Sequence, residues 1–332
     1  MNHTFFMKLA IKKAWEYQLL TYPNPAVGAV VVEDGKILSI EAHKKRGFPH
    51  AEILALLVAI KNKLDINIDP YLEDASLAHS FILSIDKRLF RNFSIYITLE
   101  PCAHMGATPS CASLLSQIEP KEVIFAIKDP IDKHSGGDNI LKNASIKVTS
   151  GILEKEAKDL IEPFIIWQKK PFFLFKLAQT HNGKIGGGYL SSKESLIHVH
   201  KLREVCDFLL IGGNSVRVDR PKLDCRFIEA PPPNIKIFSK KREFDKSIPL
   251  FNIPNREVEV IDNLDSIKKG FILVEGGEGM LKALRDKIDW FLTYHTPKLS
   301  NNQITYNINA KIEFLHTQAI GRDLMIWSRF LG

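Results

Sequence analysis

The sequence predicts an α/β protein of two domains. Stretches rich in β-branched residues alternate with amphipathic stretches, and this alternation is typical of layered α/β folds. The chain has 332 residues, which is long for a single hydrophobic core. A connecting segment punctuated by Pro163 and Pro171 separates two such series. We therefore expect one domain over 1–150 and a second over 151–332.

The first half is expected to begin with a helix and a hairpin and to continue as alternating strands and helices. Apolar residues at helical spacing predict a helix over 4–20, and Asp34-Gly35 between two apolar runs predicts a hairpin. Further helices are expected over 51–63 and 111–118, and strands over 94–99, 121–129 and 145–151. Residues 64–93 resemble an insertion with one helix, whose packed face is predicted to carry Leu77, Phe81, Ile85 and Leu89.

The second half repeats the pattern of strands and helices. Helices are expected over 191–205 and 279–288. Strands are expected over 171–178, 207–213, 234–239, 257–262, 271–277, 289–297 and 323–329. A G-x-G-x-x-G motif after a strand is absent from the sequence, which argues against a Rossmann dinucleotide site.

Composition limits the classes of partner. The 45 Lys and Arg residues exceed the 38 Asp and Glu residues only mildly and are scattered, so we expect no nucleic-acid partner. The N-terminal segment mixes Lys and Glu into its apolar pattern, unlike a signal peptide. No stretch approaches the roughly 18–20 apolar residues of a membrane span. We therefore expect a cytoplasmic protein without a membrane partner, in which cysteines stay reduced.

Four residues in two motifs point to a catalytic zinc site. The sequence has H-A-E at His50 and Glu52, then T-L-E-P-C ending at Cys102, and then Cys111 at the start of a predicted helix. A hydrolytic zinc needs three protein ligands and one open position, and an H-x-E motif followed by P-C and a second Cys is the pattern of zinc deaminases, with the Glu as acid and base. A purely structural zinc would need a fourth protein ligand, for which His104 is the nearby candidate.

These motifs resemble the deaminase domain of the bacterial bifunctional riboflavin-biosynthesis deaminase–reductases. The resemblance rests on PHAEILAL, TLEPC, PNPAVGAVVV, VIFAIKDP and the C-x8-C spacing, whereas deaminases of nucleic acid or cytidine generally carry a short P-C-x-x-C. It implies a cytidine-deaminase-like three-layer α/β/α domain, zinc on His50, Cys102 and Cys111, and Glu52 as proton shuttle. It also implies pyrimidine contacts at Asn24 and His43.

The loop between the two cysteines departs from the family. By resemblance, Gly106, Thr108 and Pro109 shape the pocket, but Met105 and Ala107 stand where the family carries basic residues. The substrate phosphate is therefore left without an assigned partner in this half. Lys133 and His134 are the candidates that the sequence offers.

The second half resembles the reductase domain of the same family, which is similar in fold to dihydrofolate reductase. The resemblance rests on FKLAQTHNGKI, on N-S-V-x-x-D-x-P-x-L-x-x-R over 214–226, on ILVEGGEGML and on DWFLTYHTPKL. It implies NADPH contacts at Ala178, Tyr189, Ser215, Asp219, Gly277, Glu278 and Gly279. It implies substrate contacts at Arg203, Leu223, Arg226 and Glu275, with Lys176 as a further polar contact. The family pattern is altered at Asn182, Gly187 and Tyr189.

The resemblance implies a bifunctional enzyme of riboflavin biosynthesis. Zinc-dependent hydrolytic deamination of 2,5-diamino-6-(5-phosphoribosylamino)pyrimidin-4-one would be followed by NADPH-dependent reduction of the ribosyl group to ribityl. We expect a homodimer formed through the reductase domain. The alternative is a deaminase whose second half only binds a ligand or dimerises, which the altered motif at Asn182 and Gly187 would fit.

Overall fold

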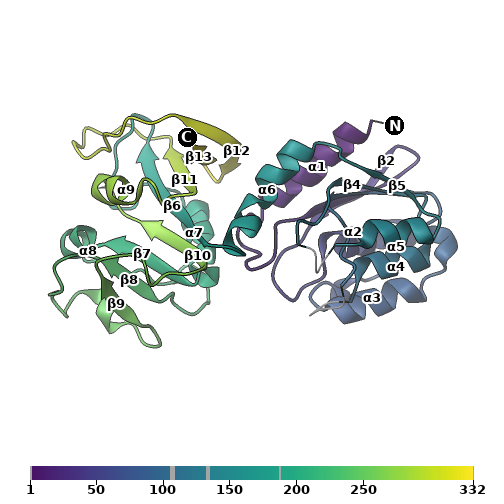
Figure 1. Cartoon of the computed structure of the whole chain (residues 1–332), viewed down its shortest axis with the longest axis horizontal. Helices are drawn as coiled ribbons and strands as arrows, with labels where there is room; N and C mark the ends of the chain where they lie inside the picture. The colour runs from purple at the N-terminus through teal and green to yellow at the C-terminus, as the bar shows by residue number, and fades with distance from the viewer. Residues whose placement is uncertain (1, 105–108, 132–134, 187, 332) are drawn as a thin grey trace. The chain divides into compact units, whose positions relative to one another are not determined.

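The chain forms two compact units, Met1–Ile165 and Ile166–Gly332. The structure, a computed structural model, describes residues 2–104, 109–131, 135–186 and 188–331 (Figure 1). Seven residues named above, Met105, Gly106, Ala107, Thr108, Lys133, His134 and Gly187, lie outside the described residues. The units divide later than residue 150 because helix α6 (Glu154–Trp167) packs on the first unit, where Gln18 Nε2 donates to the Leu160 carbonyl at 2.7 Å.

The first unit is built on a mixed sheet with the strand order β2-β1-β3-β4-β5. The strands are β1 (Gly28–Glu33), β2 (Lys36–Ala42), β3 (Phe93–Leu99), β4 (Glu122–Ile127) and β5 (Lys147–Ser150). Strand β1 pairs antiparallel with β2 and β3, and β3, β4 and β5 pair in parallel. The predicted hairpin is confirmed, with Gly35 in the left-handed region at a φ of 83°. Strands β3 and β4 are buried along their whole length, as expected where helices cover both faces.

Helices cover both faces of this sheet and make the expected three layers. Helices α1 (His3–Trp15) and α6 lie on one face (Figure 1). Helices α2 (Ala51–Leu64), α4 (Cys111–Ile118) and α5 (Gly137–Asn143) lie on the other. The seven-residue α5 was not expected from the sequence, because it is too short to display a helical period.

The inserted segment contributes helix α3 (Ala75–Ser84) between two short 3₁₀ turns, Asp69–Tyr71 and Lys87–Leu89. Phe81 stacks on Tyr71 with ring centroids 4.1 Å apart. The prediction that Leu77 belongs to the packed face is wrong, since 51% of Leu77 is exposed. The buried residues of α3 are instead Ala75, Ala78, His79 and Ile82.

The second unit is built on an eight-stranded sheet with the order β12-β13-β11-β6-β10-β7-β8-β9. Its strands are β6 (Pro171–Thr180), β7 (Phe208–Gly212), β8 (Ile235–Phe238), β9 (Val258–Ile261), β10 (Gly270–Glu275), β11 (Trp290–Thr296), β12 (Ile312–Ile320) and β13 (Asp323–Phe330). The seven expected strands are confirmed, and the α/β class holds for both units. Strand β12, at the sheet edge, was not expected because no more than two apolar residues follow one another in it and none of its residues is buried.

Six neighbouring strands of the second unit run in parallel, from β11 through β6, β10, β7 and β8 to β9. Their carboxyl ends therefore meet at one edge, where open α/β sheets bind ligands. The second unit also contains three helices, α7 (Lys193–Val205), α8 (Gly213–Asp219) and α9 (Glu278–Leu284). Within the described ranges, no helix is long and apolar enough to cross a membrane.

Candidate functional site

Three side chains of the first unit form a cluster that can hold a metal ion. The ligand atoms of His50, Cys102 and Cys111 all lie within 4.8 Å of one another. His50 Nδ1 is 3.7 Å from Cys102 Sγ and 3.3 Å from Cys111 Sγ. Among the residues that the structure describes, this is the group found to have metal-ligand spacing, and His104 does not belong to it. All four cysteines are free, so the cysteine pair is not a disulfide.

The local fold brings these donors together at two helix starts. His50 is the N-cap residue of α2, and Cys111 is the first residue of α4. Ser110 caps α4 by accepting from the Ser113 amide at 3.2 Å, and its hydroxyl donates to the Cys102 carbonyl at 2.9 Å. The same serine therefore fixes both cysteine ligands, which are nine positions apart in the sequence.

The electrostatics of the cluster suit zinc and a proton shuttle. A hydrogen bond from Cys111 lowers the pKa of Cys102 to about 4, against the opposing effect of burial, whereas burial raises the pKa of Cys111. Cys102 is therefore the readily ionised ligand, and Cys111 has to lose its proton when a metal binds. Two thiols and one imidazole that lose their protons on binding are the donor set that zinc prefers. Glu52, in the first turn of α2, is 3% exposed, and burial raises the pKa of its carboxyl above the ordinary value. A buried carboxyl beside Cys111, whose pKa burial raises, can accept a proton and give it up again, which is what a proton shuttle requires.

Asn24 and His43, expected to contact the pyrimidine, adjoin the metal cluster. The His43 ring packs edge-on against His50 with centroids 5.3 Å apart. Its Nδ1 lies 3.2 Å from the Pro49 carbonyl, and its Nε2 lies 3.1 Å from Asn24 Nδ2. Burial lowers the pKa of His43 to about 4, so the ring is neutral, with Nδ1 donating and Nε2 accepting. The network orients the Asn24 amide, whose oxygen can then accept from a ligand.

Glu100 is a buried carboxylate that the sequence analysis did not identify. It is 4% exposed, two positions before Cys102, and it accepts from three backbone amides. These belong to Asp129 at 3.1 Å, Gly136 at 3.2 Å and Asp138 at 2.9 Å. Glu100 therefore holds the segment that leads into α5 against the residues that follow β3, and the metal ligand Cys102 is one of these residues. The TLEPC motif contains it, but the motif does not say which amides it binds.

The second unit contains a cavity of about 670 Å³ at the carboxyl ends of β6, β7, β8 and β10. Six of the seven residues expected to contact NADPH line it: Ala178, Ser215, Asp219, Gly277, Glu278 and Gly279. The wall is tightly built at Gly276, where an added Cβ would lie 2.8 Å from Met280 Cβ. Only glycine at position 276 therefore allows this turn to pack so closely against Met280 at the start of α9.

A second cavity of about 310 Å³ adjoins the first. The four expected substrate contacts, Arg203, Leu223, Arg226 and Glu275, all line it, together with Lys176 and Lys222. Tyr189, expected at the cofactor, lines this smaller cavity instead and is 62% exposed. Five residues line both cavities, Ala178, Gly186, Pro221, Leu223 and Glu275, so ligands in the two spaces would meet there.

Glu275 is held between two cations at this meeting point. Its Oε2 lies 2.9 Å from Lys176 Nζ, and its Oε1 accepts from Arg203 Nε at 2.9 Å and Nη2 at 2.8 Å. Lys176 and Glu275 are direct partners in the β6–β10 register. Burial alone would raise the pKa of Glu275, but Arg203 and Lys176 outweigh burial and lower it to about 2. Arg203 is therefore paired with Glu275, and the two half-exposed cations of the cavity, Lys222 and Arg226, both pair with Asp224, at 3.3 and 2.7 Å.

Asn182, at the altered motif, ties one turn to another. Its Oδ1 accepts from the Ser300 amide at 3.1 Å and the Thr180 hydroxyl at 2.7 Å, and its Nδ2 donates to the Ser300 carbonyl at 2.8 Å. The side chain is exposed and its bonds all close the turn. Asn182 lines neither cavity, so the absence of a carboxylate at position 182 removes no polar group from their walls.

Comparison with known proteins gives consistent matches for both halves. Residues 1–127 match the family described as the cytidine and deoxycytidylate deaminase zinc-binding region, a stretch that contains the metal cluster and Glu52. The riboflavin biosynthesis protein RibD of Aquifex aeolicus is 33% identical to this chain, over 97% of each sequence. RibD of Haemophilus influenzae is 32% identical over 71% of this chain and 58% of its own length.

Two solved structures are similar over nearly the whole chain. A diaminohydroxyphosphoribosylaminopyrimidine deaminase/5-amino-6-(5-phosphoribosylamino)uracil reductase from Thermotoga maritima has a TM-score of 0.69 and 27% identity, over 99% of both chains. Acinetobacter baumannii RibD has a TM-score of 0.67 at 22% identity, over 99% of both chains, which shows a shared fold. The two-unit architecture is therefore common to this chain and to these proteins.

Proposed function

Because this chain belongs to the family of the RibD riboflavin biosynthesis proteins, we propose that it catalyses two consecutive reactions on one phosphoribosylated pyrimidine. The first unit deaminates the diaminopyrimidinone, and the second reduces the ribosyl group of the resulting uracil, the two activities for which the Thermotoga maritima protein is named. The observation that carries the proposal is the three-donor cluster of His50, Cys102 and Cys111 with Glu52 beside it.

Deamination requires a nucleophilic water, a proton carrier and a positioned ring. His50, Cys102 and Cys111 would hold the zinc, which activates a water molecule for attack near neutral pH. Glu52 carries the two protons of the water in turn, the first to the ring nitrogen and the second, from the added hydroxyl, to the departing amine, so that water and amine become carbonyl and ammonia. The orientation of Asn24 by His43 supports a role for its amide in holding the pyrimidine ring.

Reduction requires a hydride donor facing an opened sugar. NADPH, which supplies the hydride, would occupy the larger cavity, and the pyrimidine with its phosphoribosyl group would occupy the smaller one. Lys222 and Arg226 are suited to the phosphate because both lie at the half-exposed wall of that cavity, and their shared partner Asp224 balances only one of the two positive charges. The shared wall at Ala178, Leu223 and Glu275 is where the nicotinamide would approach the sugar.

A non-catalytic second unit is the less supported alternative. Similarity to the Aquifex aeolicus protein extends over 97% of the chain, and six of the seven residues expected at NADPH gather around one cavity. A homodimer formed through the second unit and a cytoplasmic location complete the proposal. Sedimentation of the purified protein tests the dimer.

The experiment follows ammonia release and NADPH absorbance together in the zinc-loaded full chain. We expect Glu52→Gln to release no ammonia at unchanged zinc content, yet to oxidise NADPH when given the deaminated pyrimidine. Arg226→Met should show the opposite pattern, since it lies in the other unit. Glu33→Gln, which alters an ion pair with Lys63 away from the cluster, is the matched control and should affect neither activity. Ammonia release that survives Glu52→Gln would refute the deaminase assignment.

A further inference from the structure

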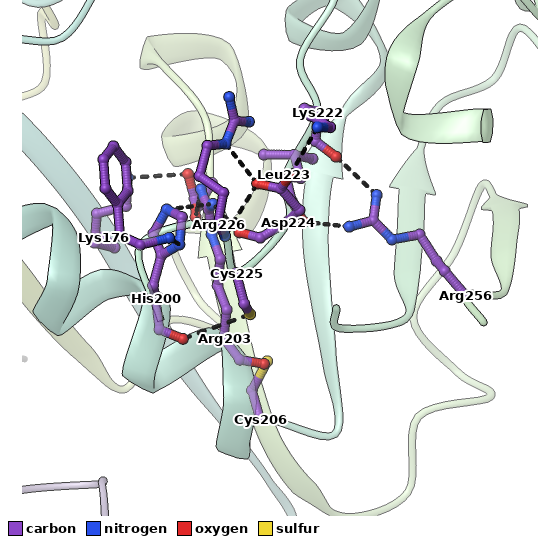
Figure 2. Close-up of polar contacts among 12 residues, drawn as sticks. Lys176, His200, Arg203, Cys206, Lys222, Leu223, Asp224, Cys225, Arg226 and Arg256 are labelled. Carbon is purple, nitrogen blue, oxygen red and sulfur yellow. Dashed lines mark hydrogen bonds and ion pairs between the residues drawn. The ribbon is translucent and has the colours of Figure 1, made fainter. Parts of the chain in front are cut away.

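The segment Pro221–Asp224 forms part of the wall between the two cavities of the second unit. Pro221 and Leu223 line both cavities. Four consecutive backbone carbonyls of the segment accept hydrogen bonds from outside it. In chain order the donors are the Leu250 amide at 3.1 Å, Arg256 Nη1 at 2.8 Å, Arg256 Nη2, and Arg203 Nη1 at 2.9 Å. Figure 2 shows Arg256 reaching the segment from the side opposite Arg203.

Leu223 needs this support because its backbone is in an unfavourable conformation. Its φ is 54°, in the left-handed region, where the Cβ of an L residue comes too close to the following carbonyl oxygen. The side chain is 6% exposed. Such conformations persist only where surrounding contacts enforce them, and they cluster at ligand sites. The two guanidinium groups that bind the carbonyls of residues 222 to 224 are the enforcing contacts at Leu223.

Arg256 is unusual because it is partly buried and binds carbonyls rather than a carboxylate. It lies just before β9, and its Nη1 also donates to the Leu250 carbonyl at 3.3 Å. Its Nε is buried with no hydrogen-bond partner among the described residues, and burial lowers the pKa of its guanidinium to about 10. Two of the three hydrogen bonds of this partly buried charge go to consecutive carbonyls of one backbone segment, which indicates that the position of that segment matters.

We propose that Arg256 is a positioning residue for the reduction, holding the carbonyls of Lys222 and Leu223 so that Leu223 and Arg226 face the bound pyrimidine. The inference rests on the proposed reductase function and adds to it a residue that touches neither cavity in the described structure. Leu223 lies where nicotinamide and sugar would meet, so a displaced segment changes the distance over which the hydride moves. A misplacement of about 1 Å can cost two orders of magnitude in rate.

The test compares Arg256→Met and Arg256→Lys with the unaltered full chain, using the deaminated pyrimidine and NADPH. A matched control is Arg329→Met, which removes a guanidinium with two bonds to Glu313 on the β12–β13 pair. For Arg256→Met we expect kcat/KM for the pyrimidine to fall roughly 10- to 100-fold. We also expect a larger kinetic isotope effect with deuterated NADPH and unchanged ammonia release. Arg256→Lys should be intermediate, because one ammonium replaces a fork that spans two carbonyls.

The isotope effect separates positioning from simple stabilisation. If Arg256 only stabilised the fold, its loss would reduce the amount of active protein and leave KM and the isotope effect unchanged, and that result would overturn the inference. Should Arg256→Met fail to fold, Arg256→Lys is judged by the same two readouts. An unaltered protein that released ammonia without oxidising NADPH would instead overturn the proposed reductase function, and this inference with it.

Discussion

The buried Glu275 offers a quantitative test of the second unit. Replacing it with Gln keeps the shape of the side chain but leaves Lys176 and Arg203 as buried cations without a counter-charge. Lowering the pKa of Glu275 from 4.5 to about 2 corresponds to about 3 kcal/mol of stability, at 1.36 kcal/mol per pKa unit. The usual cost of removing one partner of a buried ion pair is about 3–5 kcal/mol, so the two magnitudes agree.

The pH dependence has a defined sign and window. Because the pKa of Glu275 is lowered on folding, its contribution is fully present above pH 4.5 and is lost as the pH falls towards 2. The unaltered second unit should therefore lose about 3 kcal/mol across this window, and Glu275→Gln should lack that part of the loss. Below the window, the unaltered protein and the variant should converge in stability.

Urea titration followed by hydrogen-exchange mass spectrometry is the suitable assay, because peptides of the two units are measured separately. Peptides from β6 and β10 should lose protection at lower urea in Glu275→Gln, whereas those from β3 and β4 should not change. Glu313→Gln is the matched control. It disrupts a partly exposed pair with Arg329 and should cost about 1 kcal/mol or less. Equal urea midpoints for Glu275→Gln and the unaltered chain would refute the reasoning.

Three other outcomes are expected. Glu100→Ala should destabilise the first unit by about 1–3 kcal/mol and speed exchange at the Asp129, Gly136 and Asp138 amides, and unchanged exchange there would contradict its role. Cys111→Ala should reduce the zinc content found by elemental analysis to background, whereas His104→Ala should leave it stoichiometric. Burial lowers the pKa of His198 to about 4, so the second unit should lose stability as the pH falls from 6.5 to 4, where only the unfolded histidine gains a proton. His198→Gln, which keeps an acceptor for Tyr294, should weaken that dependence, and an identical pH profile would contradict it.

The sequence was most informative about the metal site, where the chemistry allows few residue types and the residues stand close together in the chain. His50 and Glu52 stand two positions apart at a helix start, and Cys111 starts another helix, so the motif itself carries much of the geometry. Strands were predictable for a related reason, since buried central strands such as β3 and β4 are continuous apolar runs. The exposed edge strand β12 and the short helices α5 and α8 have no such pattern and were not predicted.

Long-range partners were not predictable because they depend on strand order. Lys176 and Glu275 become neighbours only when β6 and β10 pair in parallel, although Phe208 on β7 is much closer to Lys176 in the sequence. The resemblance assigned Arg203 to the substrate, but its main bonds go to Glu275 and to the Asp224 carbonyl. A motif therefore identifies which residues gather at a site, and the sheet decides which of them bind each other.

Arg256 shows why supporting residues are the hardest to find from sequence. It lies outside the motifs on which the family resemblance rests, and an isolated arginine between Asn255 and Glu257 is typical of a solvated turn. What distinguishes it is the direction of its bonds, towards the carbonyls of Lys222 and Leu223 more than thirty positions earlier. Backbone carbonyls are present at every residue and leave no trace in a sequence pattern. A side chain that acts on them can therefore be recognised only after the fold has placed it, and its importance depends on the conformation of Leu223 that it enforces.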